Sequence, residues 1–476
     1  MMDQRFDFAD PPLKGSKTPQ YITGSELRVI EARNNPQSFE WGKSYEFAVG
    51  NVPFLISDKN HLELTLTFEK RKKMDTSPNT NAWEDCVSDD AKYCRLAENL
   101  GSYCIEFVQM RQGLDTLETD AFLPRGRFLY ENLALSHAAD SVKDHYMFST
   151  SDSAKHIYLT ASEFTGETYQ NFAGDALLNG MTLHVAPFAW PFQYRNRSTA
   201  HETGFPNTGQ DLTVVVKLIP HYRHLFHVKD GGTGDLNSHE FRIKVVGLTL
   251  KLAEPRFSAE GLKALTNRSL PPLRYDGNFV AQYSQNITNM PQDVHFSLQN
   301  IPMPHYMFLQ LFDPNYFTGE PGEDYKAAVY KPLDFSMSEL RIRFGNKPLN
   351  YQVANFSVGK PGSDLLRQEI MRTSNIFDNK ENNKKYFANM TGYQQKHYLV
   401  SFCSDEVNQT LLRPLDYTSD PSEPQTLSVG IIGTDKARIN NGKLVVTLIY
   451  KSMHLQYNVA SGTFLERDLK SLVISS

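Results

Sequence analysis

One stretch of strict alternation, residues 240–257 with the sequence EFRIKVVGLTLKLAEPRF, most constrains what this chain can fold into. Apolar side chains occupy every second position on both sides of Gly247. They are Phe241, Ile243, Val245, Leu248, Leu250 and Leu252. A period of two with β-branched residues predicts a half-buried strand, and the internal glycine indicates a bulge. Because Pro255 has no amide hydrogen, we expect the strand to end there.

The length and composition predict more than one β-domain. The chain has 476 residues, more than a single core usually accommodates. Its 30 Phe and 23 Tyr suit many short strands joined by turns. Residues 258–274 carry no strand pattern, and strand patterns resume after them. We therefore predict an all-β chain of two tandem antiparallel β-sandwiches, with a few short helices in loops.

The expected domain boundaries follow from these patterns. They are an extended N-terminal arm at 1–25, a first sandwich at 26–257, a linker at 258–274, a second sandwich at 275–460 and a C-terminal tail at 461–476. Both sandwiches end with an apolar strand, a turn-rich gap and a long alternating strand. These pairs are 211–219 with 241–252, and 426–432 with 443–450. The shared ending indicates a duplication.

Two kinds of segment interrupt the strand patterns. Residues 363–377 place Leu366, Ile370, Thr373 and Phe377 on one helical face, which predicts a helix. Two long loops are expected at 162–179 and 187–209, the second containing Phe188, Trp190 and Phe192. Loops of this length are usually functional surfaces, and here they are expected to cap one end of a sandwich. Residues 104–110 fit a strand or a helix equally well.

Charge and cysteine usage limit the partners and the compartment. The net charge is −5, and residues 1–10 hold Arg5 against three acidic residues, so direct binding of nucleic acid is not expected. We find no apolar run of about 18 residues and no signal-peptide pattern. The four cysteines, Cys86, Cys94, Cys104 and Cys403, match no metal or disulfide spacing. We expect free thiols in a reducing compartment.

A basic run, Lys70, Arg71, Lys72 and Lys73, ends the alternating stretch 61–69. It fits a nuclear import signal. It equally fits a solvated strand end that protects a sheet edge from aggregation.

Candidate catalytic and metal residues are few. His221, His224 and His227 are the most suggestive group, but on a strand His221 and His227 lie ~20 Å apart and His224 points the other way. The acidic run 320–324 lacks the alternating ligands of an EF-hand. We find no nucleophile elbow, phosphate-binding loop or zinc-protease motif. The prediction is therefore no catalytic, cofactor-binding or metal residues, and no enzyme activity.

Residues 330–335, YKPLDF, are followed by a strand pattern at 338–344 and by Gly345-Asn346. This run resembles the Asn-Pro-Phe-x-Phe stretch, strand and Asn-Gly turn of the double jelly-roll major capsid proteins. That family forms the shells of tailless double-stranded DNA viruses, Polinton elements, adintoviruses and virophages. Lys331, Leu333 and the reversed turn order depart from the family pattern. The helix at 363–377 and the closing strands also lie where the family has them.

The resemblance implies a double jelly roll that self-assembles as hexon-like homotrimers in an icosahedral virion. It implies minor capsid and penton proteins as partners, allows an inner membrane as a neighbour, and places the chain in the virion after synthesis in the host cytoplasm, with the nucleus as one site of assembly. Two alternatives stay open: a glycan-active enzyme on a jelly-roll scaffold, and a carbohydrate-binding or adhesive protein. Both usually need secretion, for which this chain has no signal pattern.

Overall fold

The structure is a computed structural model. It describes residues 22–33, 38–56, 60–72, 80–92, 94–96, 101, 104–113, 115–120, 177–185, 203–205, 211–220, 222, 226–228, 239–266, 273–287, 292–298, 306–312, 337–344, 347–354, 400–403, 425–433, 442–458 and 463–467.

The first unit is a sandwich of two antiparallel sheets. Its main strands are β1 (Ile22–Glu31), β2 (Ser44–Gly50), β4 (His61–Lys72), β7 (Ile105–Gln112), β8 (Asp115–Asp120), β9 (Met181–Val185), β11 (Leu212–Leu218) and β13 (His239–Phe257). One sheet has the order β1-β13-β4-β9 and the other has the order β2-β11-β7-β8. Short elements extend it: β3 (Phe54–Ile56), β5 (Glu84–Asp85), β6 (Cys94–Leu96), β10 (Thr203–Phe205), β12 (Phe226–Val228) and the 3-10 helix η1 (Ser88–Lys92).

The second unit follows a short helix, α6 (Ala259–Thr266), which lies in the expected linker. Its strands are β14 (Leu273–Ile287), β15 (Gln292–Leu298), β16 (Tyr306–Phe312), β17 (Met337–Phe344), β18 (Lys347–Ala354), β19 (Val400–Cys403), β20 (Gln425–Gly433) and β21 (Gly442–Asn458). The sheets have the orders β14-β21-β16-β19 and β15-β20-β17-β18. A further strand, β22 (Thr463–Arg467), pairs with β21 inside the segment expected as a tail.

The two units have the same topology. If the main strands of each are numbered one to eight along the chain, both contain one sheet with the order 1-8-3-6 and one with the order 2-7-4-5. This is the jelly-roll arrangement. The strands β11 and β13 of the first unit correspond to β20 and β21 of the second, which confirms the likeness of the two endings. The chain is an all-β double jelly roll.

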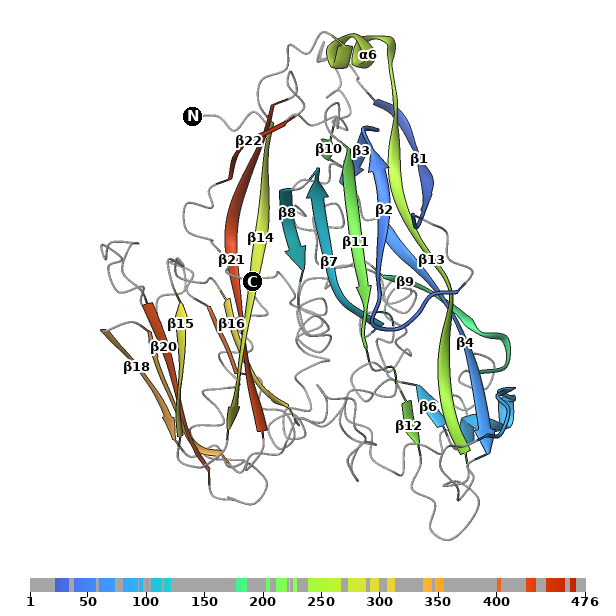
Figure 1. The fold of residues 1–476 in the computed structure, drawn as a ribbon. Helices are drawn as coiled ribbons and strands as arrows, with labels where there is room; N and C mark the ends of the chain where they lie inside the picture. The colour runs from blue at the N-terminus through green and yellow to red at the C-terminus, as the bar shows by residue number, and fades with distance from the viewer. Residues whose placement is uncertain are drawn as a thin grey trace, which may run out of the picture.

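The two sandwiches stand side by side (Figure 1). The first, drawn in blue to green, lies on the right, and the second, in yellow to red, lies on the left. At their junction β8, an outer strand of one sheet, contacts β14, an outer strand of another.

The alternating strand β13 lies inside its sheet, between β1 and β4. The six apolar side chains predicted to share a face are all buried. The predicted bulge is confirmed: the pairing with β4 shifts between Val245 and Gly247, and the extra residue, Val246, is 49% exposed. A Cβ on Gly247 would lie 3.3 Å from the Thr65 side chain, so a larger residue at this position would crowd the neighbouring strand.

The prediction that Pro255 ends the strand is wrong, because β13 continues to Phe257 and Pro255 pairs with Ser25 of β1. Alternate amides of a strand point to the same side. The amide of Ala253 points towards β4's side, where it donates to Asn60 Oδ1 at 2.7 Å. The Pro255 nitrogen therefore also faces the β4 side. The pairing of β13 with β4 has already ended at Lys251 and His61, so the missing amide hydrogen of Pro255 removes no backbone hydrogen bond between these strands.

Other strands differ from expectation in detail. The last alternating stretch was expected at 443–450, but β21 continues to Asn458. No individual strand was expected at β14 or β18; β18 follows Gly345-Asn346 in the sequence and pairs antiparallel with β17. The ambiguous segment 104–110 is the strand β7.

The core of the first sandwich lies between its two sheets. Leu62, Leu64, Leu66 and Phe68 of β4 face it, with exposures of 0–2%. From the opposite sheet, β11 contributes its own alternating apolar residues, among them Val214 and Val216. Each such side chain contributes roughly 1.5–3 kcal/mol by leaving water. The intervening residues of β4 consequently occupy the other face of the sheet.

Candidate functional site

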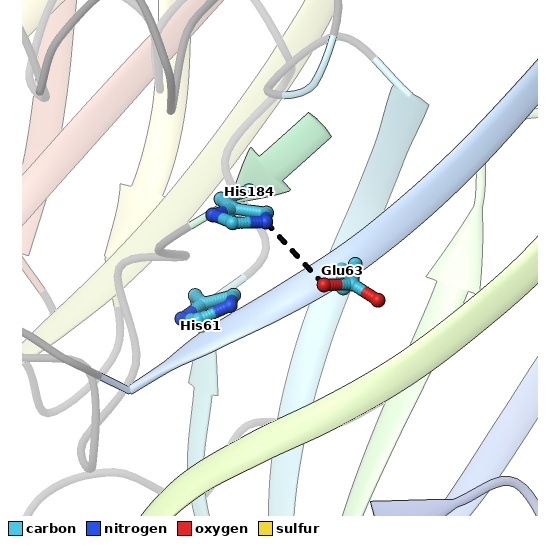
Figure 2. Close-up of side chains that lie close together, drawn as sticks. All are labelled: His61, Glu63 and His184. Atoms are coloured by element: carbon cyan, nitrogen blue, oxygen red, sulfur yellow. Dashed lines mark ion pairs between the residues drawn. The ribbon is translucent and has the colours of Figure 1, made fainter. Parts of the chain in front are cut away.

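Three side chains with metal-binding atoms meet on that outer face (Figure 2). His61 and Glu63 are two residues apart on β4, so they project from the same face of the strand. His184 lies on β9, and its backbone is directly opposite Glu63 in the ladder. The cluster therefore follows from strand alternation and from the register between β4 and β9.

The cluster is compact and half-buried. The His184 Nε2 atom lies 3.4 Å from Glu63 Oε2. The rings of His61 and His184 stack with centroids 4.3 Å apart, one above the other beside Glu63 (Figure 2). Lys251 of β13 reaches the same Glu63 oxygen from the other side. His61 is only 5% exposed, which places one imidazole almost out of water.

Positive charge gathers around Glu63. A hydrogen bond from Lys251 holds the pKa of the Glu63 carboxyl below its usual value, against an opposing effect of burial. Positive charge on Lys251, His184 and His61 acts in the same direction as the hydrogen bond. Glu63 is thus a carboxylate at neutral pH. One donor atom from each of His61, Glu63 and His184 lies within 4.8 Å of the others, a spacing within reach of one bound cation.

A second polar group lies farther along the same strands. Glu69 of β4 pairs with Arg242 and Lys244 of β13, and Arg71 pairs with Glu240 at 2.6 Å. The Trp83 ring lies near two guanidinium groups, 4.5 Å from that of Arg71 and 4.3 Å from that of Arg242. The ion pairs are cross-strand contacts between β4 and β13, and the Trp83 ring packs against two of their guanidinium groups.

The basic run at the end of β4 takes part in this structure. Lys70 pairs with Asp90 of η1 at 2.8 Å, and the two side chains are 18% and 9% exposed. Arg71 is held by Glu240. Lys73 lies outside the described residues. At least two of the three basic side chains that the structure describes, those of Lys70 and Arg71, are therefore engaged in ion pairs at the sheet.

The two thiols whose side chains are described are free, as predicted, and both are buried. Burial, with a contribution from the charge of Asp90, raises the pKa of Cys86 to about 12. Burial also raises the pKa of Cys104. A reactive cysteine needs a lowered pKa, so neither residue is an activated nucleophile.

Most residues singled out in the sequence lie outside the described part of the chain. These are His221, His224, the acidic run 320–324, the family-like run 330–335, the helix expected at 363–377 and Phe188, Trp190 and Phe192. The backbone of His227 lies in β12, which pairs with β6. Of the two long loops, only 177–179 and 203–205 are described.

Sequence reasoning missed the His61, Glu63 and His184 cluster. A local signal was present, since His61 and Glu63 occupy alternate positions of a clearly patterned strand. The third member comes from a strand more than a hundred residues away, and its register with β4 is set by folding. In the part of the chain that the structure describes, no helix is long and apolar enough to cross a membrane.

No protein-family model matches the chain, and no curated protein matches its sequence. Two solved structures are similar over nearly its whole length. A chain of the Sputnik virophage, from a cryo-EM structure, has 11% sequence identity and a TM-score of 0.54, covering 96% of this chain and 92% of that one. The mavirus major capsid protein has 12% identity and a TM-score of 0.54, covering 97% and 94%. The resemblance to the double jelly-roll major capsid proteins is thereby confirmed at the level of the fold.

Proposed function

We propose that this chain is a structural major capsid protein, which self-assembles as pseudo-hexameric trimers into the icosahedral shell of a tailless double-stranded DNA virus or virus-like element. One observation carries the proposal. The chain repeats one jelly-roll strand order twice, and this double unit is similar to the mavirus major capsid protein over nearly the full length of both chains.

The repetition supplies a geometric reason for trimers. Two similar sandwiches in one chain, repeated three times around an axis, give six similar blocks, which is the symmetry a hexagonal lattice requires. Closed cyclic symmetry also satisfies subunit interfaces without open-ended fibres. The contact between β8 and β14 joins the two blocks of one chain, as a rigid pseudo-hexamer needs.

The domain division supports the same role. We propose a first jelly roll at 26–257, a linker at 258–274 and a second jelly roll at 275–460, with the arm at 1–25 extending to neighbours. Two bounds differ from the strands, because β1 begins within that arm at Ile22 and β22 pairs part of the expected tail at 461–476 with β21. In support, β13 ends at Phe257, α6 follows, and β14 begins at Leu273. Minor capsid and penton proteins are the proposed partners of the assembled chain, and the proposal is compatible with an inner membrane beneath the shell.

The role we propose is structural and not catalytic. The buried, high-pKa thiols Cys86 and Cys104 favour this over cysteine chemistry. The net charge of −5 favours contact with the genome through other proteins. The ion pairs of Lys70 and Arg71 favour a strand-end role for the basic run over nuclear import. The proposed location is the virion, after synthesis in the host cytoplasm.

Electron microscopy of the purified full-length protein tests the proposal. We expect compact particles with a hexagonal outline, three chains each, which form flat arrays or shells at high concentration. Isolated single chains at all concentrations would favour the alternatives, a glycan-active enzyme or a carbohydrate-binding protein. Incubation with an oligosaccharide panel would then separate those two by turnover or binding.

A further inference from the structure

We propose that His61, Glu63 and His184 form a binding site for a transition-metal ion, with Zn²⁺ as the expected occupant. The donor set is two imidazoles and one carboxylate. Imidazole nitrogen suits zinc and its first-row neighbours, whereas calcium and magnesium prefer sites built from oxygen alone. A site with two histidines and one glutamate leaves a fourth coordination position for water.

The distances fit such an ion. Zinc lies about 2.0–2.2 Å from nitrogen and oxygen ligands, so donor atoms in a tetrahedral set are roughly 3.4 Å apart. His184 Nε2 and Glu63 Oε2 are 3.4 Å apart. The three donor atoms all lie within 4.8 Å, so rotation of a ring by about an ångström or two at its tip completes the set. The backbone pairing of Glu63 with His184 fixes this spacing without any loop.

Burial and ring stacking hold the two histidines close together at the site. His61 is 5% exposed, and its ring stacks on that of His184 at 4.3 Å. Each ring offers one nitrogen donor, so two imidazoles and the Glu63 carboxylate can share one ion. Among the described residues, the titratable groups in contact at the site are these two rings, Glu63 from β4 and Lys251 from β13.

Lys251 acts as a competitor for the carboxylate. Its ammonium group and His184 both contact Glu63 Oε2. Oε2 is also the carboxylate oxygen nearest the two imidazole rings (Figure 2), so a bound ion and the ammonium group would compete for the same atom. The Lys251 side chain is 22% exposed and has a path to solvent. Without metal, Lys251 balances the charge of Glu63; with metal, it is displaced.

The bound ion would fasten the outer strand β9 to β4. In the described sheet, β9 pairs with β4 alone. An ion shared by His184 on β9 and by His61 and Glu63 on β4 would therefore add a cross-link to the one ladder that holds β9 in the described sheet.

Metal titration of the full-length protein tests the site. After removal of metal with EDTA, Co²⁺ is added and its visible absorption recorded, followed by calorimetry with Zn²⁺. We expect one equivalent of Co²⁺ with the intense bands of a tetrahedral nitrogen–oxygen site. His184→Ala and Glu63→Gln should each weaken binding by roughly 100-fold or more. His295→Ala is the matched control, because His295 lies on β15 in the other sandwich and contacts Ser428.

Lys251→Met tests the site while leaving all three metal-ligating residues in place. Removing the competing cation should tighten Zn²⁺ binding on the order of tenfold, and Zn²⁺ should raise the melting temperature of this variant more than that of the wild type. Binding should weaken in acid, because protons compete with the metal ion for the ligand atoms. Circular dichroism of each variant without metal verifies folding.

Two results would overturn the site. One is equal Co²⁺ affinity and spectrum in the wild type and the double variant His61→Ala/His184→Ala. The other is unchanged or weaker Zn²⁺ binding in Lys251→Met. Neither result depends on trimer formation, so the metal site and the capsid role are tested independently.

Discussion

Gly180 lies directly against Leu66: a Cβ at Gly180 would stand 2.6 Å from the carbonyl oxygen of Leu66. The residue immediately precedes β9, where that strand joins β4. Its φ of +74° is in the left-handed region, which residues with a side chain rarely adopt. Close approach and backbone conformation therefore both require glycine at this position.

We expect Gly180→Ala to lower the free energy of unfolding by more than about 2 kcal/mol. Two other glycines separate the effect of the backbone conformation from the effect of the close contact. Gly50 has a φ of +72° but open space around it, so Gly50→Ala should cost about 1 kcal/mol. Gly24 has neither constraint, and Gly24→Ala should change stability by less than about 0.5 kcal/mol. Urea denaturation measures all three. Equal losses in Gly180→Ala and Gly50→Ala would show that β9 can move away from Leu66.

Asn60 joins three segments of the first sandwich from a fully buried position. Its Nδ2 donates to the Leu55 carbonyl and its Oδ1 accepts from the Ala253 amide, both at 2.7 Å. Asn60→Ala leaves both backbone groups without this partner, and we expect a loss of about 2–4 kcal/mol in thermal or urea unfolding. Asn81, whose side chain donates to Lys72 at an exposed position, is the control. A loss no larger than that of Asn81→Ala would mean that water replaces the Asn60 amide.

The Glu69 carboxylate should make stability depend on acid pH. Burial acts to raise its pKa, but hydrogen bonds from Lys244 and Arg242 outweigh burial and lower it. The unfolded chain therefore takes up this proton at a higher pH than the folded protein. The stabilisation is complete above the ordinary glutamate pKa of about 4.3 and is lost as pH falls through the lowered, folded value.

Glu69→Gln should accordingly be less stable than the wild type at pH 7, by about 1–2 kcal/mol, and the difference should shrink towards pH 3. Denaturation curves at several pH values measure this. Glu26→Gln removes an exposed ion pair with Arg256 and should leave the profile unchanged. A constant difference between Glu69→Gln and the wild type at every pH would contradict the role of the ionised carboxylate.

The buried thiols should resist modification in the folded protein. At pH 8, Cys86 and Cys104 remain protonated and out of contact with solvent. Alkylation with iodoacetamide, read for each cysteine by peptide mass spectrometry, should label neither in the native protein and both in denaturant. Rapid native labelling of Cys86 would indicate an exposed or activated thiol and would weaken the case against cysteine chemistry.

Local sequence patterns predicted many strands of both sandwiches, because the alternation of apolar and polar residues along a half-buried strand can be seen within one segment. β13 and β4 show it clearly, and the bulge at Gly247 came from the same pattern. β14 was missed because its sequence, LRYDGNFVAQYSQNI, is rich in polar residues and has no clean alternation. The end of β13 was misjudged at Pro255 because the cost of a proline depends on which neighbour its nitrogen faces.

Contacts between distant segments could not be read from the sequence. The meeting of Glu63 and His184 depends on the register of β9 against β4, which is fixed by the packing of Leu64 and Leu183 on the opposite face. The capsid-like fold was predictable for a different reason: the two halves of the chain end with the same succession of strand patterns, and a motif in the second half resembles the double jelly-roll capsid proteins.

The central claim is that the working unit is a trimer of double jelly rolls. Each interface of an obligate capsid trimer should bury more than about 2,000 Å², so the trimer should survive dilution. The monomer mass is 54.2 kDa. Native mass spectrometry and light scattering of the purified full-length chain measure the mass of the assembly directly, with no partner protein added.

We expect one stable species of three times 54.2 kDa that persists in dilute solution and at moderate salt. A chain that remains a 54.2 kDa monomer up to high protein concentration would contradict it.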